Sequence, residues 1–188
     1  MNHIITPEEV KEYGRAMSQH VDKKVLEALI QETENMDIRP VLGAVFFQNL
    51  VEADREEPFV KLLLNGGYYP YVYDPTFDAT FQQEAIVLDA HFQGLKSAVA
   101  YYVQAKLFKT NDNQITRFGV MQKDSEYGTR PSFAERNAQY NDLCAIADQY
   151  LCDTLEYLSI YRERYPLYEC GGGGHIKNNR TIYRIIGD

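Results

Sequence analysis

Histidine is where metal binding or acid–base chemistry usually begins, and the chain has four: His3, His20, His91 and His175. None of them forms a His-x-x-x-His pair, which would place two imidazoles on one face of a helix. Asp89 and His91 are two residues apart, and in the helix predicted over this region that spacing turns them to different sides. The histidines therefore predict no metal site.

The other reactive residues also lack a catalytic pattern. Cys144 and Cys152 are eight residues apart on a predicted helix, about 12 Å along its axis, which is too far for a disulfide. The third cysteine, Cys170, has no partner at a recognised spacing. Gly171–Gly174 is not followed by the Lys-Ser/Thr pair of a phosphate-binding loop, and there is no Gly-x-Ser-x-Gly motif. We predict no catalytic, cofactor-binding or metal-ligating residue, and we do not expect an enzyme.

The bulk properties suit one domain, with 188 residues and a formal net charge of −8. This charge disfavours nucleic-acid binding, because phosphate binding needs a basic surface, but it does not exclude a protein that DNA slides past without binding. No apolar run approaches the roughly 20 residues of a membrane-spanning helix. The N-terminal residues lack the basic and apolar blocks of a secretory signal, which favours a cytoplasm-like compartment.

Periodicity predicts helices along the first half of the chain. Thr6-Pro7-Glu8-Glu9 is a capping box that begins a first helix, expected to end near Ala16. A second helix follows Asp22 and is expected to end before Pro40, which disfavours the helical conformation at Arg39. Pro40 then begins a third helix that continues to Leu50.

Two longer helices are predicted in the second half. The first runs from about Ile86 to Lys109 and is apolar on most sides, which places it in the middle of a bundle or at a subunit contact. Gly94 within it suggests a close helix crossing. The second runs from Pro131 to about Arg164, on the order of 45–50 Å, and is the longest element.

Extended segments connect these helices. Tyr68–Tyr73 is rich in strand-forming residues, and Pro70 favours an edge strand or extended loop. Ile115–Lys123 fits a short strand or arm. The chain contains 15 Tyr, 9 Phe and no Trp, a composition that suits either a helix-packing core or protein interfaces.

The C-terminal residues differ in composition from the rest. Residues 166–188 contain three basic and two acidic side chains, so this tail is +1 and the remainder −9. A glycine hinge at Gly171–Gly174 precedes a strand-like segment, which suggests a docking arm that adds to a sheet edge of a partner or a neighbouring copy. A frayed terminus, or a strand closing onto its own domain, is the alternative. The predicted interface residues of the tail are Arg180, Ile182, Tyr183, Arg184 and Ile185.

Together these elements predict a mainly α fold: a helical bundle of four to five helices with a small extended or β-hairpin element and a C-terminal strand-like tail. The predicted units are a helical domain over residues 1–165 and the docking tail over residues 166–188.

Several segments, in this order along the chain, resemble the head–tail connector proteins of tailed phages and prophages, particularly the form in phages of gut Bacteroidetes. They are Ile5–Arg15 (ITPEEVKEYGR), Asp37–Gly43 (DIRPVLG), Leu63–Tyr68 (LLNGGY), Gly94–Phe108 (GLKSAVAYYVQAKLF) and Thr116–Lys123 (TRFGVMQK). The resemblance covers roughly residues 5–165, its motifs are structural, and the tail has no counterpart in it.

The resemblance implies a virion subunit, assembled in the host cytoplasm, that forms a ring of about a dozen copies beneath the portal protein. Such a ring joins the head to tail components and extends a channel through which DNA passes without specific binding. The resemblance also implies that the segments Tyr68–Tyr73 and Thr116–Arg130 reach across subunit interfaces, with the interface residues Tyr68, Tyr69, Tyr71, Tyr73, Phe118, Tyr127 and Arg130. It implies no membrane and no cofactor. Two alternatives remain open. One is a non-catalytic adaptor or scaffolding protein with a single protein or peptide partner, and the other is an enzyme whose deep pocket gathers several polar groups.

Overall fold

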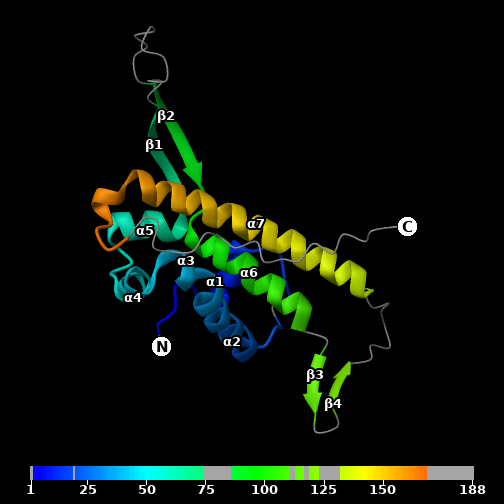
Figure 1. The fold of residues 1–188 in the computed structure, drawn as a ribbon. Coiled ribbons are helices and arrows are strands. Elements are labelled where there is room, and N and C mark those ends of the chain that lie inside the picture. The colour runs from blue at the N-terminus through cyan, green and yellow to red at the C-terminus, as the bar shows by residue number, and fades with distance from the viewer. Residues whose placement is uncertain are drawn as a thin grey trace.

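The computed structural model describes residues 2–18, 20–73, 86–110, 113–116, 119–122 and 132–168. A helical body carries two antiparallel hairpins, which project from its opposite ends (Figure 1). The mainly α class with a small hairpin element is confirmed.

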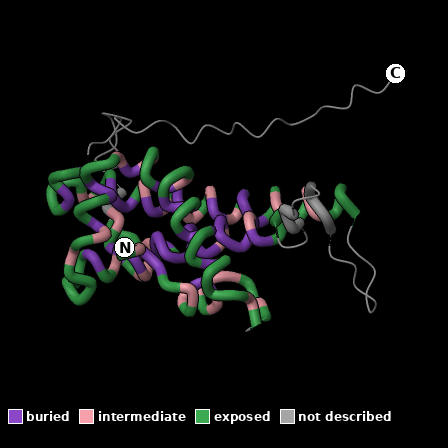
Figure 2. Tube along the Cα trace, turned by 90° about the horizontal axis from the view of Figure 1, so that it is seen from below, coloured by how far each residue is buried: buried purple, intermediate pink, exposed green. Residues whose placement is uncertain are grey.

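Helix α6 (Leu95–Thr110) lies at the centre of the body. It packs antiparallel along α7 (Phe133–Ile160) and also contacts α1, α2 and α5. Most of its residues are buried, including Lys96, Ser97 and Gln104, so little of its surface meets solvent. Figure 2 shows the buried residues gathered in the interior of the body, with exposed residues around them. This confirms the expectation that a helix apolar on most sides lies in the middle of the bundle.

The N-terminal helices form one side of the body. In α1 (Pro7–Tyr13) the predicted capping box is present, because the Thr6 hydroxyl accepts from the Glu9 N–H while the Glu9 carboxylate accepts from the Thr6 N–H. Helix α2 (Lys23–Thr33) begins at its cap, Asp22, as predicted.

The second helix does not end before Pro40, which corrects the sequence prediction. A π-helical turn, η1 (Glu34–Ile38), continues α2 directly into α3 (Arg39–Leu42), and Arg39 itself is helical. The proline ring normally clashes with the carbonyl four residues earlier, and the wider π turn just before Pro40 relieves that clash.

The predicted third helix is divided at Gly43. There the backbone adopts φ +84°, a conformation that glycine tolerates, and it separates α3 from α4 (Ala44–Glu52). Helix α5 (Pro58–Asn65) follows and ends at Gly66, which also has a positive φ.

Residues 86–92 form a strand, where the sequence pattern predicted the start of a helix. Strand β2 (Ile86–Phe92) pairs antiparallel with β1 (Gly67–Tyr73), with Gly67 opposite Phe92 and Tyr73 opposite Ile86. Gly94 lies between β2 and α6 with φ +80°, and a Cβ there would lie 2.2 Å from the backbone nitrogen of Gly66. The close approach expected at Gly94 is therefore present. It brings the segment between β2 and α6 against the end of α5, and it is not a crossing of two helices.

The second hairpin lies between α6 and α7. Strands β3 (Asn113–Thr116) and β4 (Gly119–Gln122) pair antiparallel. The single strand or arm predicted over Ile115–Lys123 is therefore divided into two strands, and the first of them begins earlier, at Asn113. Helix α7 begins after its cap, Ser132, and is followed by a short 3₁₀ turn, η2 (Arg162–Arg164).

The described chain continues to Tyr168, which is buried and lies edge-on to Phe46, with 5.5 Å between the ring centroids. The predicted hinge and strand-like segment of the tail lie outside the described residues. So do the predicted interface residues Arg180, Ile182, Tyr183, Arg184 and Ile185.

Candidate assembly surface

The β1–β2 hairpin presents two different faces. Because side chains alternate along a strand and paired residues share a face, one set of residues faces the body and the other faces away. We call the first set the inner face: Tyr69, Tyr71, Leu88, Ala90 and Phe92, of which Leu88, farthest from the base of the hairpin, is 54% exposed. The second set is the outer face: Tyr68, Pro70, Val87, Asp89 and His91.

The inner face is anchored to the C-terminal half of α7 by aromatic contacts. Tyr157 is fully buried and stacks on Phe92 with 4.6 Å between ring centroids, while its ring lies edge-on to Tyr69 at 5.2 Å. Tyr69 also lies 6.0 Å from Tyr161. The hairpin is therefore attached to the body through buried aromatic rings. Tyr69, which is only 6% exposed, holds the hairpin against the body.

Tyrosine hydroxyls complete this attachment. The Tyr161 hydroxyl donates to the carbonyl of Pro70 over 2.8 Å, and the Tyr165 hydroxyl donates to the carbonyl of Phe59 over 2.9 Å. The Tyr157 and Tyr165 hydroxyls lie 3.2 Å apart. Burial raises the pKa of both Tyr157 and Tyr165, so both hydroxyls stay protonated and available as donors at neutral pH.

The outer face is exposed over its whole described length. Tyr68 is 75% and Val87 63% exposed, and Pro70, Asp89 and His91 are exposed as well. The rings of Tyr68 and His91 meet edge-on with centroids 4.7 Å apart. Asp89 and His91 share this face, which corrects the prediction that they point to different sides of a helix. The outer face thus offers an aromatic ring, two apolar side chains, an imidazole and one carboxylate.

The two edges of the hairpin also differ. On β1, Pro70 has no N–H, and its carbonyl already accepts from Tyr161, so this edge is blocked near its middle. Within the described residues no strand pairs with the other edge, which belongs to β2. An unpaired edge of this kind is a ready site for protein contact.

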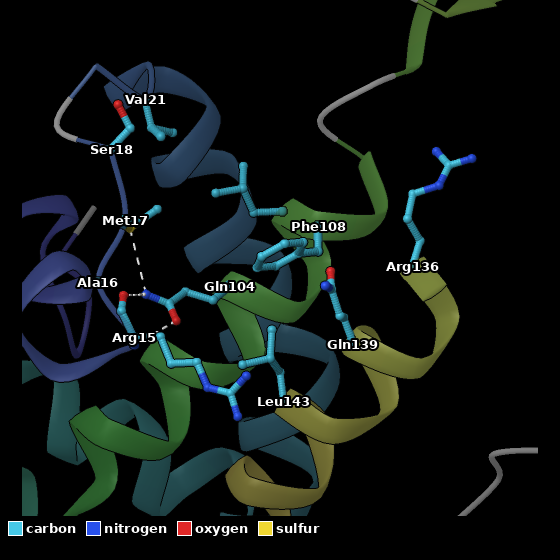
Figure 3. A pocket seen from close by; sticks show the side chains of 11 residues that line it. Arg15, Ala16, Met17, Ser18, Val21, Gln104, Phe108, Arg136, Gln139 and Leu143 are labelled. Carbon is cyan, nitrogen blue, oxygen red and sulfur yellow. Dashed lines mark hydrogen bonds between the residues drawn. The ribbon is translucent and has the colours of Figure 1, made fainter. Parts of the chain in front are cut away.

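A groove of about 470 Å³ lies at the other end of the molecule, between the segment after α1, the C-terminal half of α6 and the N-terminal half of α7 (Figure 3). Its apolar residues are Met17, Val21, Leu107, Phe108 and Leu143, with Ala16 beside them, and its polar residues are Arg15, Ser18, Gln104, Arg136 and Gln139. Phe108, which borders the groove, is 47% exposed.

Gln104 fixes one wall of this groove. Its side-chain oxygen accepts from the Arg15 N–H over 2.8 Å, and its nitrogen donates to the Arg15 carbonyl over 2.7 Å. A Cβ at Gly14 would lie only 2.2 Å from the Gln104 side chain, so the chain passes close to it. The Arg15 guanidinium forms an ion pair with Asp142 of α7 at 2.7 Å. The groove is therefore a formed feature, held by the buried Gln104 amide and by an exposed ion pair.

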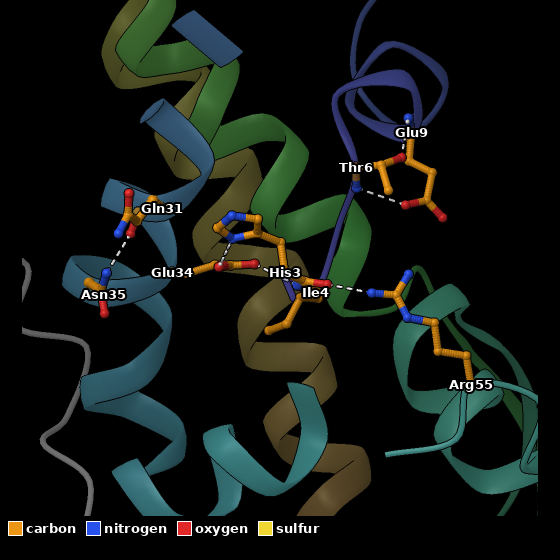
Figure 4. A network of polar contacts seen from close by, with 8 residues as sticks. All are labelled: His3, Ile4, Thr6, Glu9, Gln31, Glu34, Asn35 and Arg55. Atoms are coloured by element: carbon orange, nitrogen blue, oxygen red, sulfur yellow. Dashed lines mark hydrogen bonds and ion pairs between the residues drawn. The ribbon is translucent and has the colours of Figure 1, made fainter. Parts of the chain in front are cut away.

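A polar cluster around Glu34 holds the N-terminal residues and has a structural role (Figure 4). The carboxylate of Glu34, buried in the π turn, accepts from the Ile4 N–H over 2.6 Å and lies 2.7 Å from the His3 ring nitrogen. The Arg55 guanidinium donates to the His3 carbonyl. These contacts hold Ile4 and Ile5 in the core. Among the described residues, no group of three or more His, Cys, Asp or Glu is placed to hold a metal ion.

The interface residues predicted from the sequence lie in different places. Tyr68 lies on the exposed outer face, whereas Tyr69 is buried and Tyr71 half-buried on the inner face. Tyr73 ends β1, opposite Ile86. Phe118, Tyr127 and Arg130 lie outside the described residues.

Sequence reasoning missed the remaining outer-face residues and the groove. The signal for β2 was the apolar run Ile86-Val87-Leu88, followed by Phe92 and Gly94. The groove left no such signal, because its walls come from three separate parts of the chain.

Comparison with known proteins gives a family but no activity. Residues 38–178, three quarters of the chain, match the model of a family described as a family of unknown function, DUF6712. No curated protein and no solved structure matches the chain. Within the described residues, no helix combines the length and apolar character needed to cross a membrane.

Proposed function

The chain belongs to the DUF6712 family of unknown function, and we propose that it is a non-catalytic assembly subunit whose projecting β1–β2 hairpin binds other protein chains. The observation that carries the proposal is the exposed outer face of that hairpin.

A hairpin that serves only the core normally has one apolar face and one polar face. Here the inner face packs on α7, yet the outer face also presents Tyr68, Pro70 and Val87 to solvent. A group of exposed apolar residues on a projecting element is typical of a protein-binding surface. The hairpin is also held firmly at its base, so a partner would meet a preformed surface.

We further propose that the subunit acts in the ring that joins the head of a tailed phage to its tail. Two features support this assignment. The sequence resembles head–tail connector proteins, and the two hairpins project from opposite ends of the body, as suits contacts made head to tail around a ring (Figure 1). In this proposal the portal protein and tail components are the partners, the virion is the location, and the net charge of −8 keeps DNA mobile in the channel.

Mass photometry and negative-stain electron microscopy of the purified chain test this proposal. The chain is measured alone, over a range of concentrations, and mixed with rings of a portal protein from the same genome. We expect ring-shaped particles of about a dozen copies, formed either alone or on the portal ring.

A chain that stays monomeric at every concentration and does not bind the portal ring would contradict the proposal. If the chain instead binds one other protein without self-assembly, it is an adaptor and the ring assignment is wrong.

A further inference from the structure

We propose that the groove between α6 and α7 receives the outer face of the β1–β2 hairpin of a second copy, with Val87 against its apolar floor and Asp89 beside Arg136. This inference rests on the proposed function, because it names the contact through which the copies assemble.

The positions of the two surfaces support this pairing. The hairpin is attached at the C-terminal half of α7, and the groove lies at its N-terminal half. Tyr157 at the hairpin is 14 to 21 residues from Leu143 and Arg136 at the groove, so at about 1.5 Å per residue the two surfaces lie roughly 20–30 Å apart along the helix. A contact between different surfaces continues from copy to copy into the proposed ring when each hairpin enters the groove of the next copy, whereas two copies that exchange hairpins would form a two-fold pair.

The apolar surfaces are complementary in kind. The outer face presents Val87, which is 63% exposed, and the groove presents a floor of aliphatic, thioether and aromatic side chains from three segments. Methionine, here Met17, is common at protein-binding surfaces because its flexible side chain adapts to what it contacts. The groove volume of about 470 Å³ admits a few side chains, and not a folded element.

The spacing of Arg136 and Leu143 on α7 also fits the spacing of Asp89 and Val87 on β2. On α7, Arg136 and Leu143 border the groove seven residues apart, a rise of about 10 Å. On β2, Asp89 and Val87 share the outer face and are two residues apart, about 7 Å along the strand. A hairpin that places Val87 near Leu143 therefore brings the Asp89 carboxylate within side-chain reach of the Arg136 guanidinium.

The positions of the two arginines in the groove decide which of them we pair with Asp89. Asp89 is the carboxylate of the outer face, and two arginines border the groove. Arg15 belongs to the wall that Gln104 fixes, whereas Arg136 lies on α7 at the end of the groove nearest the start of that helix (Figure 3). Arg136 is therefore the cation in line with Leu143 along the helix. An ion pair at a partly enclosed contact orients the partner more strongly than one in open water.

Charge reversal tests this pairing directly. Asp89→Arg would place two cations together at the contact, and Arg136→Glu would place two carboxylates together. We expect each variant alone to associate at least tenfold more weakly than wild type in sedimentation velocity. An equal mixture of the two variants should recover assembly, because the new guanidinium at position 89 of one variant meets the new carboxylate at position 136 of the other, while the remaining contacts keep the original pair.

The matched controls are Glu27→Arg and Lys24→Glu on the exposed side of α2, which change the net charge by the same amounts. We expect them to assemble as wild type does. The pairing is wrong if either single variant assembles like its control, or if the mixture associates no better than the single variants. In that case wild-type assembly still stands, and only the contact is rejected. If wild type itself neither assembles nor binds the portal ring, the proposed function fails together with this inference.

Discussion

At its C-terminal half α7 packs Tyr157 and Tyr161 against the chain's own hairpin, whereas at its N-terminal half Arg136 and Leu143 border an open groove. The first contact is built from packed aromatic rings and from tyrosine hydroxyls that form hydrogen bonds with backbone carbonyls and with one another. The second is lined by apolar and cationic side chains over which the described chain places no further element. The C-terminal half of α7 thus belongs to the folded core, whereas its N-terminal half borders an open groove.

If the chain assembles as proposed, one helix separates the residues that stabilise the fold from the residues that bind a partner. Substitutions at the aromatic end should mainly change the free energy of unfolding, because those side chains are buried in the core. Substitutions on the outer face or in the groove should mainly change association. The following variants test whether the two effects are separate.

The largest expected effect is at Tyr157. Tyr157→Ala removes a fully buried ring that contacts both strands of the hairpin, and we expect the free energy of unfolding to fall by about 3–5 kcal/mol. Urea denaturation followed by circular dichroism measures it. The matched control is Tyr68→Ala, which removes an exposed tyrosine and should cost within about 0.5 kcal/mol. Equal losses in the two variants would show that the hairpin faces are wrongly assigned.

A smaller effect is expected at the groove. Gln104→Leu leaves the N–H and carbonyl of Arg15 without the buried amide that satisfies them, at a cost of about 1–3 kcal/mol. Because that amide holds the wall of the groove, association should weaken as well. Unfolding curves and sedimentation velocity on the same sample separate the two effects. A stable variant with unchanged assembly would mean that this wall takes no part in binding.

Removal of one hydroxyl tests how the hairpin is held. Tyr161→Phe keeps the ring against Tyr69 but removes the donor to the Pro70 carbonyl, and we expect a loss of about 0.5–1.5 kcal/mol. Hydrogen exchange at the amides of β1 and β2 should become faster, while exchange within α6 stays the same. If exchange in the hairpin does not change, the hydroxyl does not contribute to its attachment.

The smallest effect concerns an ion pair on the first turn of α6, directly after the hairpin. Burial raises the pKa of Glu9, but the Lys96 ammonium at 2.6 Å and the Thr6 N–H at 2.8 Å outweigh it, and the pKa lies below its ordinary value of 4.5. The stability from the ionised carboxylate is therefore present above pH 4.5 and lost as the pH falls through the lower pKa of the folded state.

Glu9→Gln keeps a hydrogen-bond acceptor for Lys96 and should cost under about 1 kcal/mol at pH 7. The difference from wild type should shrink between about pH 5 and pH 3 in urea denaturation. A difference that stays constant over this range would show that the charge of Glu9 contributes nothing.

The sequence allows some of these features to be predicted and conceals others for physical reasons. Local patterns are sufficient for the capping box at Thr6 and for the buried centre of α6, because both depend on neighbouring residues. The sequence favours a helix over residues 86–92 because Leu88, Phe92, Leu95 and Val99 also recur at helical spacing. Pairing with the distant strand β1 decides the structure there. The end of a helix predicted at Pro40 is absent because a π turn accommodates the proline.

The candidate surface is only partly predictable. The tyrosine-rich segment correctly draws attention to the hairpin, but composition does not distinguish the exposed Tyr68 from the buried Tyr69. That distinction needs the register of β1 and β2. The groove depends on three segments that meet only in the folded chain, so no local pattern indicates it.

The central claim is that the outer face of the hairpin binds protein, and a variant of that face tests it most directly. The double substitution Tyr68→Ser with Val87→Ser leaves the inner face and the core untouched. In sedimentation velocity, under conditions where wild type assembles, we expect this variant to remain monomeric while its melting temperature stays unchanged. A variant that assembles to the same size as wild type would contradict the account.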